Sequence, residues 1–394
     1  MNSSSKNTIY ASTVLSLCLV SDSLLYLLLP LYFSDFGVTI VWVGILLSVN
    51  RLVRILFQPW IHLLYEKLGV KNTLYIAILL ASSACLIFVS TLPIYWLIFS
   101  RILWGIAYSL MRMCCLFIAT QDSNSSLKKL AWYSSIQEIG PLIVLLLAPW
   151  LIVIFNIKFV MIFSLFLCFI AIPIALKIKH LDDKTSYRSE IKDSSNKFLS
   201  WNADYAQTLV ISILHDGLWV IALASLLFVS DNTQADTAFI VAMFYVLRRT
   251  FNLVLGIIHI KFSYLKMSRN TINFSILLLS LGGFLIYLNQ IILGSLIAIS
   301  GRSLYMLHLP KILSDEQKTT VNKKKTINAF TLCRDIGSAI GTLIAGFIIS
   351  VDLTQSFFLF SSILSCFILM KTNQKKVINI KTLSLFRPLS WRRR

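Results

Sequence analysis

The chain has 394 residues, of which 57% are hydrophobic and only 13% are charged. Soluble proteins average about 25% charged residues, and a chain this apolar has too few polar side chains to cover a surface in water. The composition therefore excludes a soluble globular protein and indicates that most of the chain lies in lipid.

Apolar runs long enough to cross a bilayer follow one another along the whole sequence. A hydrocarbon core of about 30 Å requires roughly 20 residues of helix. The first run is too long for the core of a signal peptide, so we expect it to remain as the first span. The runs predict twelve spans, in chain order: Ile9–Leu31, Ile40–Leu64, Thr73–Leu92, Ile94–Ile118, Leu130–Phe155, Phe159–Ile178, Tyr205–Val229, Ala238–Phe262, Asn273–Leu288, Ile291–Ile312, Ile327–Ile349 and Ser356–Met370.

Lysine and arginine are concentrated in alternate connections between these spans, a bias that marks the cytoplasmic side. The other connections contain only Lys158, together with the acidic residues Asp35, Asp231, Asp236 and Asp352. The pattern predicts an integral protein of the bacterial inner membrane with both termini in the cytoplasm. This cytoplasmic excess of lysine and arginine accounts for the net charge of +19, so we expect no nucleic-acid partner, and we expect the basic tail to lie near anionic lipid.

Charged residues inside the predicted spans recur at nearly one spacing. Four pairs are separated by 194 to 201 residues: Asp22 and Asp216, Arg51 and Arg248, Arg101 and Arg302, and Glu138 and Asp335. Because charges are rare in membrane helices, these coincidences predict a duplication. We therefore expect an all-α membrane protein of twelve transmembrane helices in two six-helix bundles, related as a parallel repeat. The bundles would be residues 1–178 and 205–371, joined by a cytoplasmic linker at 179–204 and followed by a basic cytoplasmic tail at 372–394.

Three segments carry a resemblance to a known family. Residues 62–71, His-Leu-Leu-Tyr-Glu-Lys-Leu-Gly-Val-Lys, resemble the loop motif between spans 2 and 3 of the major facilitator superfamily, Gly-x-Leu-Ala-Asp-Arg-x-Gly-Arg-Lys. Here His62 replaces the first glycine and Glu66 replaces the aspartate. Arg101 to Gly105 is similar to the Arg-x-x-x-Gly motif of span 4, and Gly140-Pro141 resembles part of the span 5 motif of drug or metabolite exporters that exchange protons.

The resemblance implies alternating access about a central cavity, with gates at the cytoplasmic side. In the first half it implies a gate that includes Glu66, Lys67, Gly69 and Arg112, with Arg112 paired to Glu66. In the second half Arg334 and Asp335 would form the symmetric gate.

The remaining charges in the spans are candidates for substrate and proton binding. The spans contain four acids, Asp22, Glu138, Asp216 and Asp335, and eight arginines, Arg51, Arg54, Arg101, Arg112, Arg248, Arg249, Arg302 and Arg334. Guanidinium groups bind carboxylate or phosphate through two hydrogen bonds, so one hypothesis places Arg51, Arg101, Arg248 and Arg302 around an organic anion. The alternative hypothesis pairs each arginine with an acid and leaves a neutral cavity for a lipophilic compound.

The predicted function is secondary transport of a small organic solute, exported in exchange for protons that bind at Asp22 or Glu138, with Asp216 in the same constellation. The alternatives are uptake of an organic anion by the same fold and a membrane receptor that transports nothing. We expect no enzyme activity, cofactor or metal, because the sequence has no glycine-rich phosphate loop, nucleophile elbow or metal-ligand spacing. The expected partners are a small-molecule substrate, protons and the lipid bilayer, and the expected state is a monomer.

Overall fold

The computed structural model describes residues 3–90, 93–120, 126–178, 203–228, 233–261, 269–316 and 320–372. The expected linker lies almost entirely outside these residues, and so does all of the tail beyond residue 372. The described part is built from helices, and no residue in it is in a strand.

The first half contributes six long helices: α1 (Ser3–Leu31), α2 (Ile40–Leu56), α3 (Gln58–Val89), α4 (Ile94–Thr120), α5 (Ser126–Ile154) and α6 (Ile157–Leu176). A short 3-10 turn, η1 (Phe33–Phe36), joins α1 to α2. In the second half one span is made of α8 (Ala203–Ile211), η3 (Ser212–Leu218) and α9 (Trp219–Phe228). It is followed by α10 (Gln234–Lys261), α11 (Arg269–Tyr287), α12 (Ile291–Asp315), α13 (Thr320–Ser350) and α14 (Thr354–Thr372).

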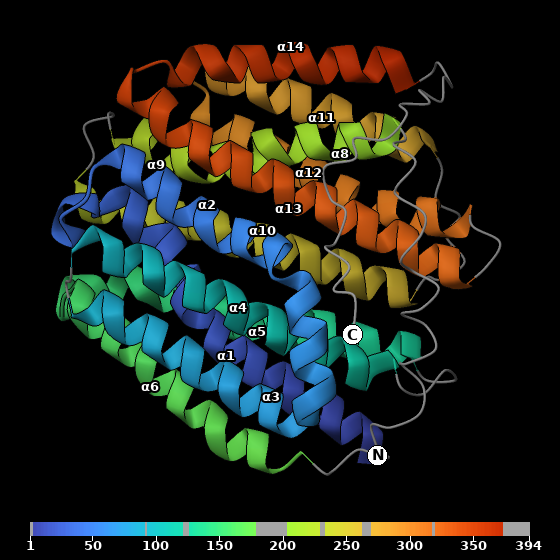
Figure 1. Cartoon of the computed structure of the whole chain (residues 1–394). Coiled ribbons are helices and arrows are strands. Elements are labelled where there is room, and N and C mark those ends of the chain that lie inside the picture. The colour runs from blue at the N-terminus through green and yellow to red at the C-terminus, as the bar shows by residue number, and fades with distance from the viewer. Residues whose placement is uncertain are drawn as a thin grey trace, which may run out of the picture.

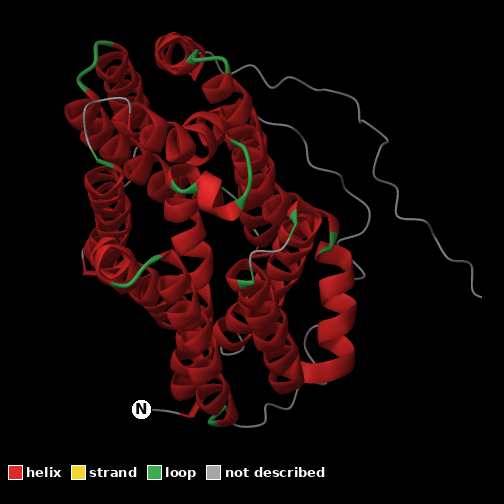
Figure 2. Cartoon of the chain, turned by 90° about the vertical axis from the view of Figure 1, so that its left-hand side faces the viewer, coloured by secondary structure: helices red, strands yellow, loops and turns green. Residues whose placement is uncertain are grey.

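These elements confirm the predicted twelve-helix architecture among the described residues. Ten helices are long and apolar enough to cross a bilayer by themselves. The other two spans are α2, which has 17 residues and contains Arg51 and Arg54, and α14, whose apolar part is short. The helices run side by side, with those of the second half in the upper part of Figure 1 and most of those of the first half below. Viewed along the spans, they form two bundles (Figure 2).

The two bundles meet along α2 with α13 and along α5 with α10. The N-terminus lies at one end of the spans in Figure 1, which we call the terminal end; the opposite end is the far end. At the far end one hydrophobic cluster is continuous across both halves, whereas toward the terminal end each half has a cluster of its own. The halves are therefore packed together at the far end and separately packed at the terminal end.

Glycines allow this close approach at the far end. A Cβ on Gly44 of α2 would lie 2.6 Å from the carbonyl oxygen of Thr342 and 3.1 Å from the Cα atom of Gly346, both in α13. Nearby, Gln234 donates a hydrogen bond of 2.6 Å to the carbonyl oxygen of Leu31, which also links the two halves. Small residues let membrane helices pack backbone to backbone.

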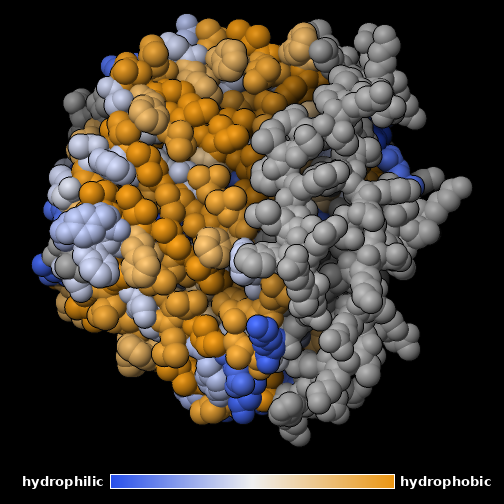
Figure 3. Space-filling model, in the orientation of Figure 1, coloured by the Kyte–Doolittle hydropathy of each residue, from blue (hydrophilic) through white to orange (hydrophobic). Residues whose placement is uncertain are grey.

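The outer surface of the spans is apolar, as expected for contact with lipid. Large side chains on α5 and α6 are exposed, among them Trp150 at 61% and Phe166 at 58%. In Figure 3 hydrophobic residues cover most of the described surface over the spans, and hydrophilic residues gather at its edges.

One boundary differs from the sequence prediction. The second span was expected to continue to Leu64, but α2 ends at Leu56. Pro59 stands at the start of α3 and has no N–H to continue the hydrogen bonding of α2, so the chain changes direction there. Gly69, with φ 71° and ψ 173°, then breaks α3 into a short first segment, Gln58 to Leu68, and the span that follows.

Candidate functional site

A cavity of about 200 Å³ lies between the two halves. Residues from α1, α2, α5, η3, α9, α10 and α12 line it: Ser23, Tyr26, Arg51, Glu138, Leu145, Asp216, Val220, Tyr245, Arg248, Arg249, Asn252 and Arg302. Among these lining residues four arginines face two carboxylates, so the cavity has an excess of two positive charges. A site with this excess favours an anionic ligand.

Asp216 is the centre of the cavity's charge network in the second half. Its Oδ1 accepts a hydrogen bond of 2.7 Å from Nε of Arg302 and a second, short one from Arg248. Asp216 lies in η3, a π-helical turn in the middle of its span. π-Helical turns are rare and often occur at functional sites.

Arg51 is held differently from the other cavity arginines. Its Nη1 donates a hydrogen bond of 3.3 Å to the main-chain carbonyl of Asp216, and its guanidinium lies 5.3 Å from the centre of the Tyr26 ring. Within the part of the chain that the structure describes, no carboxylate is within ion-pair distance of Arg51. Its charge therefore remains available to a ligand.

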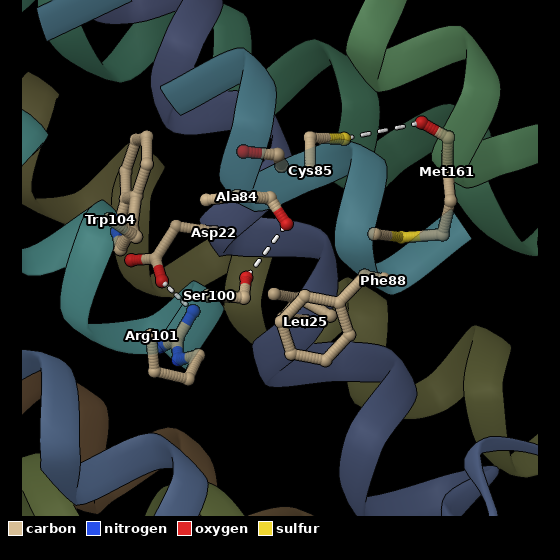
Figure 4. Close-up of a pocket in the computed structure, with 10 residues that line it drawn as sticks. Asp22, Leu25, Ala84, Cys85, Phe88, Ser100, Arg101, Trp104 and Met161 are labelled. Atoms are coloured by element: carbon tan, nitrogen blue, oxygen red, sulfur yellow. Dashed lines mark hydrogen bonds and ion pairs between the residues drawn. The ribbon is translucent and has the colours of Figure 1, made fainter. Parts of the chain in front are cut away.

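Asp22 and Arg101 lie outside this cavity, in a small pocket within the first half (Figure 4). Asp22 Oδ1 is 2.8 Å from Nη1 of Arg101 and accepts a hydrogen bond of 3.3 Å from Asn50. Nε of Arg101 donates to the carbonyl oxygen of Leu46, and only 1% of the Arg101 side chain is exposed. This arginine is thus buried within the first half and paired with Asp22, and the structure does not place it beside the other three arginines of the anion hypothesis.

A pair formed by Glu138 of α5 and Arg249 of α10 joins the two halves inside the cavity. Arg249 Nη1 contacts a carboxylate oxygen of Glu138, and its Nη2 donates a hydrogen bond of 2.9 Å to the Ser23 hydroxyl. The side chains of Arg249 and Glu138 are 25% and 22% exposed, so this pair is more accessible than the pair of Asp22 and Arg101. Arg249 is one of the eight arginines expected inside the spans but was not among the predicted site residues, although the Arg248-Arg249 doublet is visible in the sequence.

The residues expected at the gates form a different arrangement. Asp335 of α13 is the centre, at 3.8 Å from Arg54, 3.9 Å from Arg112 and 3.8 Å from Arg334. Arg112 of the first half and Asp335 of the second half therefore contact each other across the two halves. The guanidinium of Arg54 also lies over the aromatic ring of Tyr108, with 4.8 Å between the guanidinium carbon and the ring centre.

The other gate residues lie near the first segment of α3. Gly69 has a positive φ and forms the bend described above. Lys67 is exposed. The side chain of Glu66 is outside the described residues, so the expected pair of Arg112 and Glu66 stays a prediction.

Several lining residues carried no charge signal in the sequence. Ser23, Tyr26, Tyr245 and Asn252 line the cavity because the two halves meet there, and no local pattern distinguishes them from core residues. Across the described ranges, no group of three or more His, Cys, Asp or Glu side chains comes close enough together to hold a metal ion.

Comparison with known proteins agrees with the architecture. The family model described as Major Facilitator Superfamily matches residues 11–257. The crystal structure of the nucleoside transporter NupG is similar with a TM-score of 0.73 and 13% sequence identity, over 95% of this chain and 100% of that chain. A mutant of the same transporter gives a TM-score of 0.68 and 12% identity, over 93% of this chain and 99% of that chain.

At such low identity these structures show a shared fold and nothing more specific, and no curated protein matches the chain. The family model, however, covers more than half of the sequence and includes all the cavity residues of the first half. The chain therefore belongs to the major facilitator superfamily of membrane transporters.

Proposed function

We propose that this transporter carries a small organic anion by alternating access, together with a proton. The single observation that carries the proposal is the excess of two arginines over carboxylates among the described residues that line the central cavity. Guanidinium groups in a site shielded from water bind carboxylate or phosphate strongly. A neutral cavity for a lipophilic compound would require each of these arginines to be matched by an acid.

Arg51 is the residue that we assign to the anionic group of the substrate. Its contacts with a carbonyl and with Tyr26 hold the guanidinium in place without neutralising it. Tyr26 and Tyr245 line the same cavity and supply an apolar surface for the rest of an organic molecule. Arg248 and Arg302 share Asp216, so together they add one further positive charge.

The contact between Arg249 and Glu138 supports a mechanism for proton coupling. A substrate anion that binds Arg249 competes with Glu138 for the same guanidinium. When Glu138 loses this counter-charge, its carboxylate takes up a proton from water in the cavity, because an isolated charge in a low-dielectric site is unfavourable. Of the two acids that the sequence suggested, Asp22 is the less accessible, so we assign the proton to Glu138.

This coupling bears on the direction of transport. The sequence prediction was export in exchange for protons, in which the substrate and the proton bind in turn. In the mechanism above, anion and proton favour each other's binding, and this favours the alternative, uptake of the anion with a proton. Export stays a prediction, and the response to an imposed pH gradient distinguishes the two.

The test uses the purified full chain in proteoliposomes with a fixed set of probes. Succinate, citrate and glycerol phosphate represent anions, uridine represents the neutral ligands suggested by the nucleoside transporter, and tetraphenylphosphonium represents lipophilic cations. We expect flux of at least one anion and none of uridine or tetraphenylphosphonium. An acidic exterior should accelerate anion uptake, whereas antiport would instead make it accelerate anion efflux.

Arg51→Gln is the decisive variant and Lys158→Gln its matched control, because Lys158 is exposed in the first turn of α6 and lies outside the cavity. Loss of a charged hydrogen bond should lower apparent anion affinity about 10- to 100-fold in Arg51→Gln and leave the control unchanged. Undiminished anion transport by Arg51→Gln, or transport of uridine with all anions inert, would overturn the proposal.

A further inference from the structure

The first segment of α3, Gln58 to Leu68, lies across the spans and not along them. In Figure 1 it is the blue helix between α2 and the remainder of α3, and it runs vertically while the spans run from side to side. Figure 2, viewed along the spans, again shows this helix from the side, at the right edge of the lower bundle. The segment therefore lies parallel to the membrane plane, near the terminal end of α2.

One face of this crosswise segment is packed on the first half. Ile61 and Tyr65 are only 5% and 4% exposed and belong to the hydrophobic cluster of the terminal end. The Tyr65 ring also contacts the ring of Phe117 in α4, with 5.2 Å between ring centres. These contacts fix which side of the segment faces outward.

The outward face is apolar, with side chains at helical spacing. Trp60 is 67% exposed and Leu63 is 53% exposed, and Lys67 completes the face one turn further on. Just before the segment, Leu56 and Phe57 are 61% and 38% exposed, so the apolar surface continues from the end of α2. Large apolar side chains grouped in this way are unfavourable in water and mark a contact surface.

We propose that this outward face is embedded in the boundary between lipid headgroups and acyl chains. Helices that lie in this layer place tryptophan and leucine in the acyl region and lysine near the headgroups, and the outward face carries these three residue types. Three features on one short helix thus point to the bilayer surface: its direction relative to the spans, its apolar outward face and the continuity of that face with α2.

An anchor at this place has a consequence for α2. This helix carries Arg51 in the cavity and Arg54 beside Asp335, and the crosswise segment follows it after a single residue, Phe57. With the segment held in the bilayer surface, the terminal end of α2 stays at one depth while the second half moves. The positive φ of Gly69 gives the bend on the other side of the segment.

The test measures the depth of Leu63 in proteoliposomes of the full chain. Leu63→Cys is labelled with the environment-sensitive fluorophore NBD in a Cys366→Ser background, because Cys366 is the one exposed cysteine among the described residues. The reference is Asn270→Cys in the same background, a polar exposed position at the start of α11. We expect blue-shifted emission at position 63, strong quenching by lipids that carry a nitroxide near the headgroup, and iodide quenching several-fold weaker than at position 270.

Iodide quenching at position 63 equal to that at position 270 would overturn the proposal. So would protection from both quenchers that disappears when the protein is diluted into more lipid, because a second copy of the chain would then cover the face. If Leu63→Cys fails to fold, Trp60→Cys tests the same face one turn earlier with the same expected result.

Discussion

Asp216 accepts a hydrogen bond of 2.7 Å from Arg302, and this contact repeats a contact of the first half. There, Asp22 lies 2.8 Å from Arg101. In each half the aspartate comes from the first span and the arginine from the fourth. The two pairs differ in position, however, because Asp22 and Arg101 line a small pocket within the first half while Asp216 and Arg302 line the central cavity between the halves.

The pair in the first half should be a strong determinant of stability. Asp22→Asn leaves the Arg101 guanidinium, whose side chain is 1% exposed, without its counter-charge. Removal of one member of a buried ion pair costs roughly 3–5 kcal/mol. We expect a clear loss of the folded, monodisperse fraction on heating in detergent.

A double variant distinguishes this charge effect from a packing effect. Asp22→Leu together with Arg101→Met removes both charges and keeps apolar volume, so it should recover most of the stability lost in Asp22→Asn. Equal instability of the single and double variants would show that packing, and not the unpaired charge, is responsible.

Closure of the far end depends on the contact between α2 and α13. Gly44→Leu introduces a side chain where even a Cβ would lie 2.6 Å from the Thr342 carbonyl oxygen. The two halves should then fail to close at this end, and transport should fall at least about tenfold, since a shift of only 1.4 kcal/mol in the equilibrium has that effect.

The measurement is the rate at which an impermeant maleimide modifies a cysteine placed at Gln234, a far-end residue that contacts Leu31. Gly44→Leu should accelerate this labelling, whereas Leu52→Phe, a change at an exposed position of the same helix, should not. Slow labelling together with normal transport in Gly44→Leu would show that the contact between α2 and α13 does not control closure of the far end.

Asp335 should hold the two halves together toward the terminal end. In Asp335→Asn, Arg54 and Arg112 lose the carboxylate that they share across the halves and are left as neighbouring like charges. The opening at this end should widen. A cysteine at Leu145, which lines the cavity, should react several-fold faster with a maleimide supplied from the terminal side.

Arg334→Gln provides the comparison for this prediction, because Arg334 contacts Asp335 from the same helix and forms no ion pair across the halves with the residues that the structure describes. Its effect on labelling at position 145 should be small. Identical labelling in the parent and in Asp335→Asn would show that the cluster does not restrain the terminal end.

Much of this architecture was predictable from the sequence because lipid imposes simple constraints. A span needs a fixed length of apolar helix, so the twelve helices are visible as runs. Charges in these runs are costly, so the recurrence of Asp22 at Asp216 and of Arg101 at Arg302 carries a strong signal. Because such charges are costly, their recurrence at one spacing also predicted the duplication of the two halves.

The pairing of the charges was not predictable. Sequence position gives the depth of a residue in its span, but the partner depends on the rotation of each helix and on which spans meet. Arg112 is an example, since it contacts Asp335 of the other half. The end of α2 was predictable in principle, because Pro59 cannot continue the helix, but the apolar composition beyond it concealed the break.

The last prediction concerns the pH dependence of transport. If an anion takes Arg249 from Glu138 and the freed carboxylate binds a proton, acidification should strengthen anion binding in the parent protein. Glu138→Gln imitates the protonated carboxyl and leaves Arg249 without an acidic partner among the described residues, so it should bind the anion tightly at every pH. It should also exchange anion across the membrane without a response to a pH gradient.

The measurement is the apparent dissociation constant of the transported anion at pH values from about 5.5 to about 8. Asp236→Asn, which removes an exposed acid near the far end of α10, is the control and should keep the slope of the parent. A pH slope that survives in Glu138→Gln would move the coupling proton to another group, and Asp216, held by two arginines in the same cavity, would be the next to test.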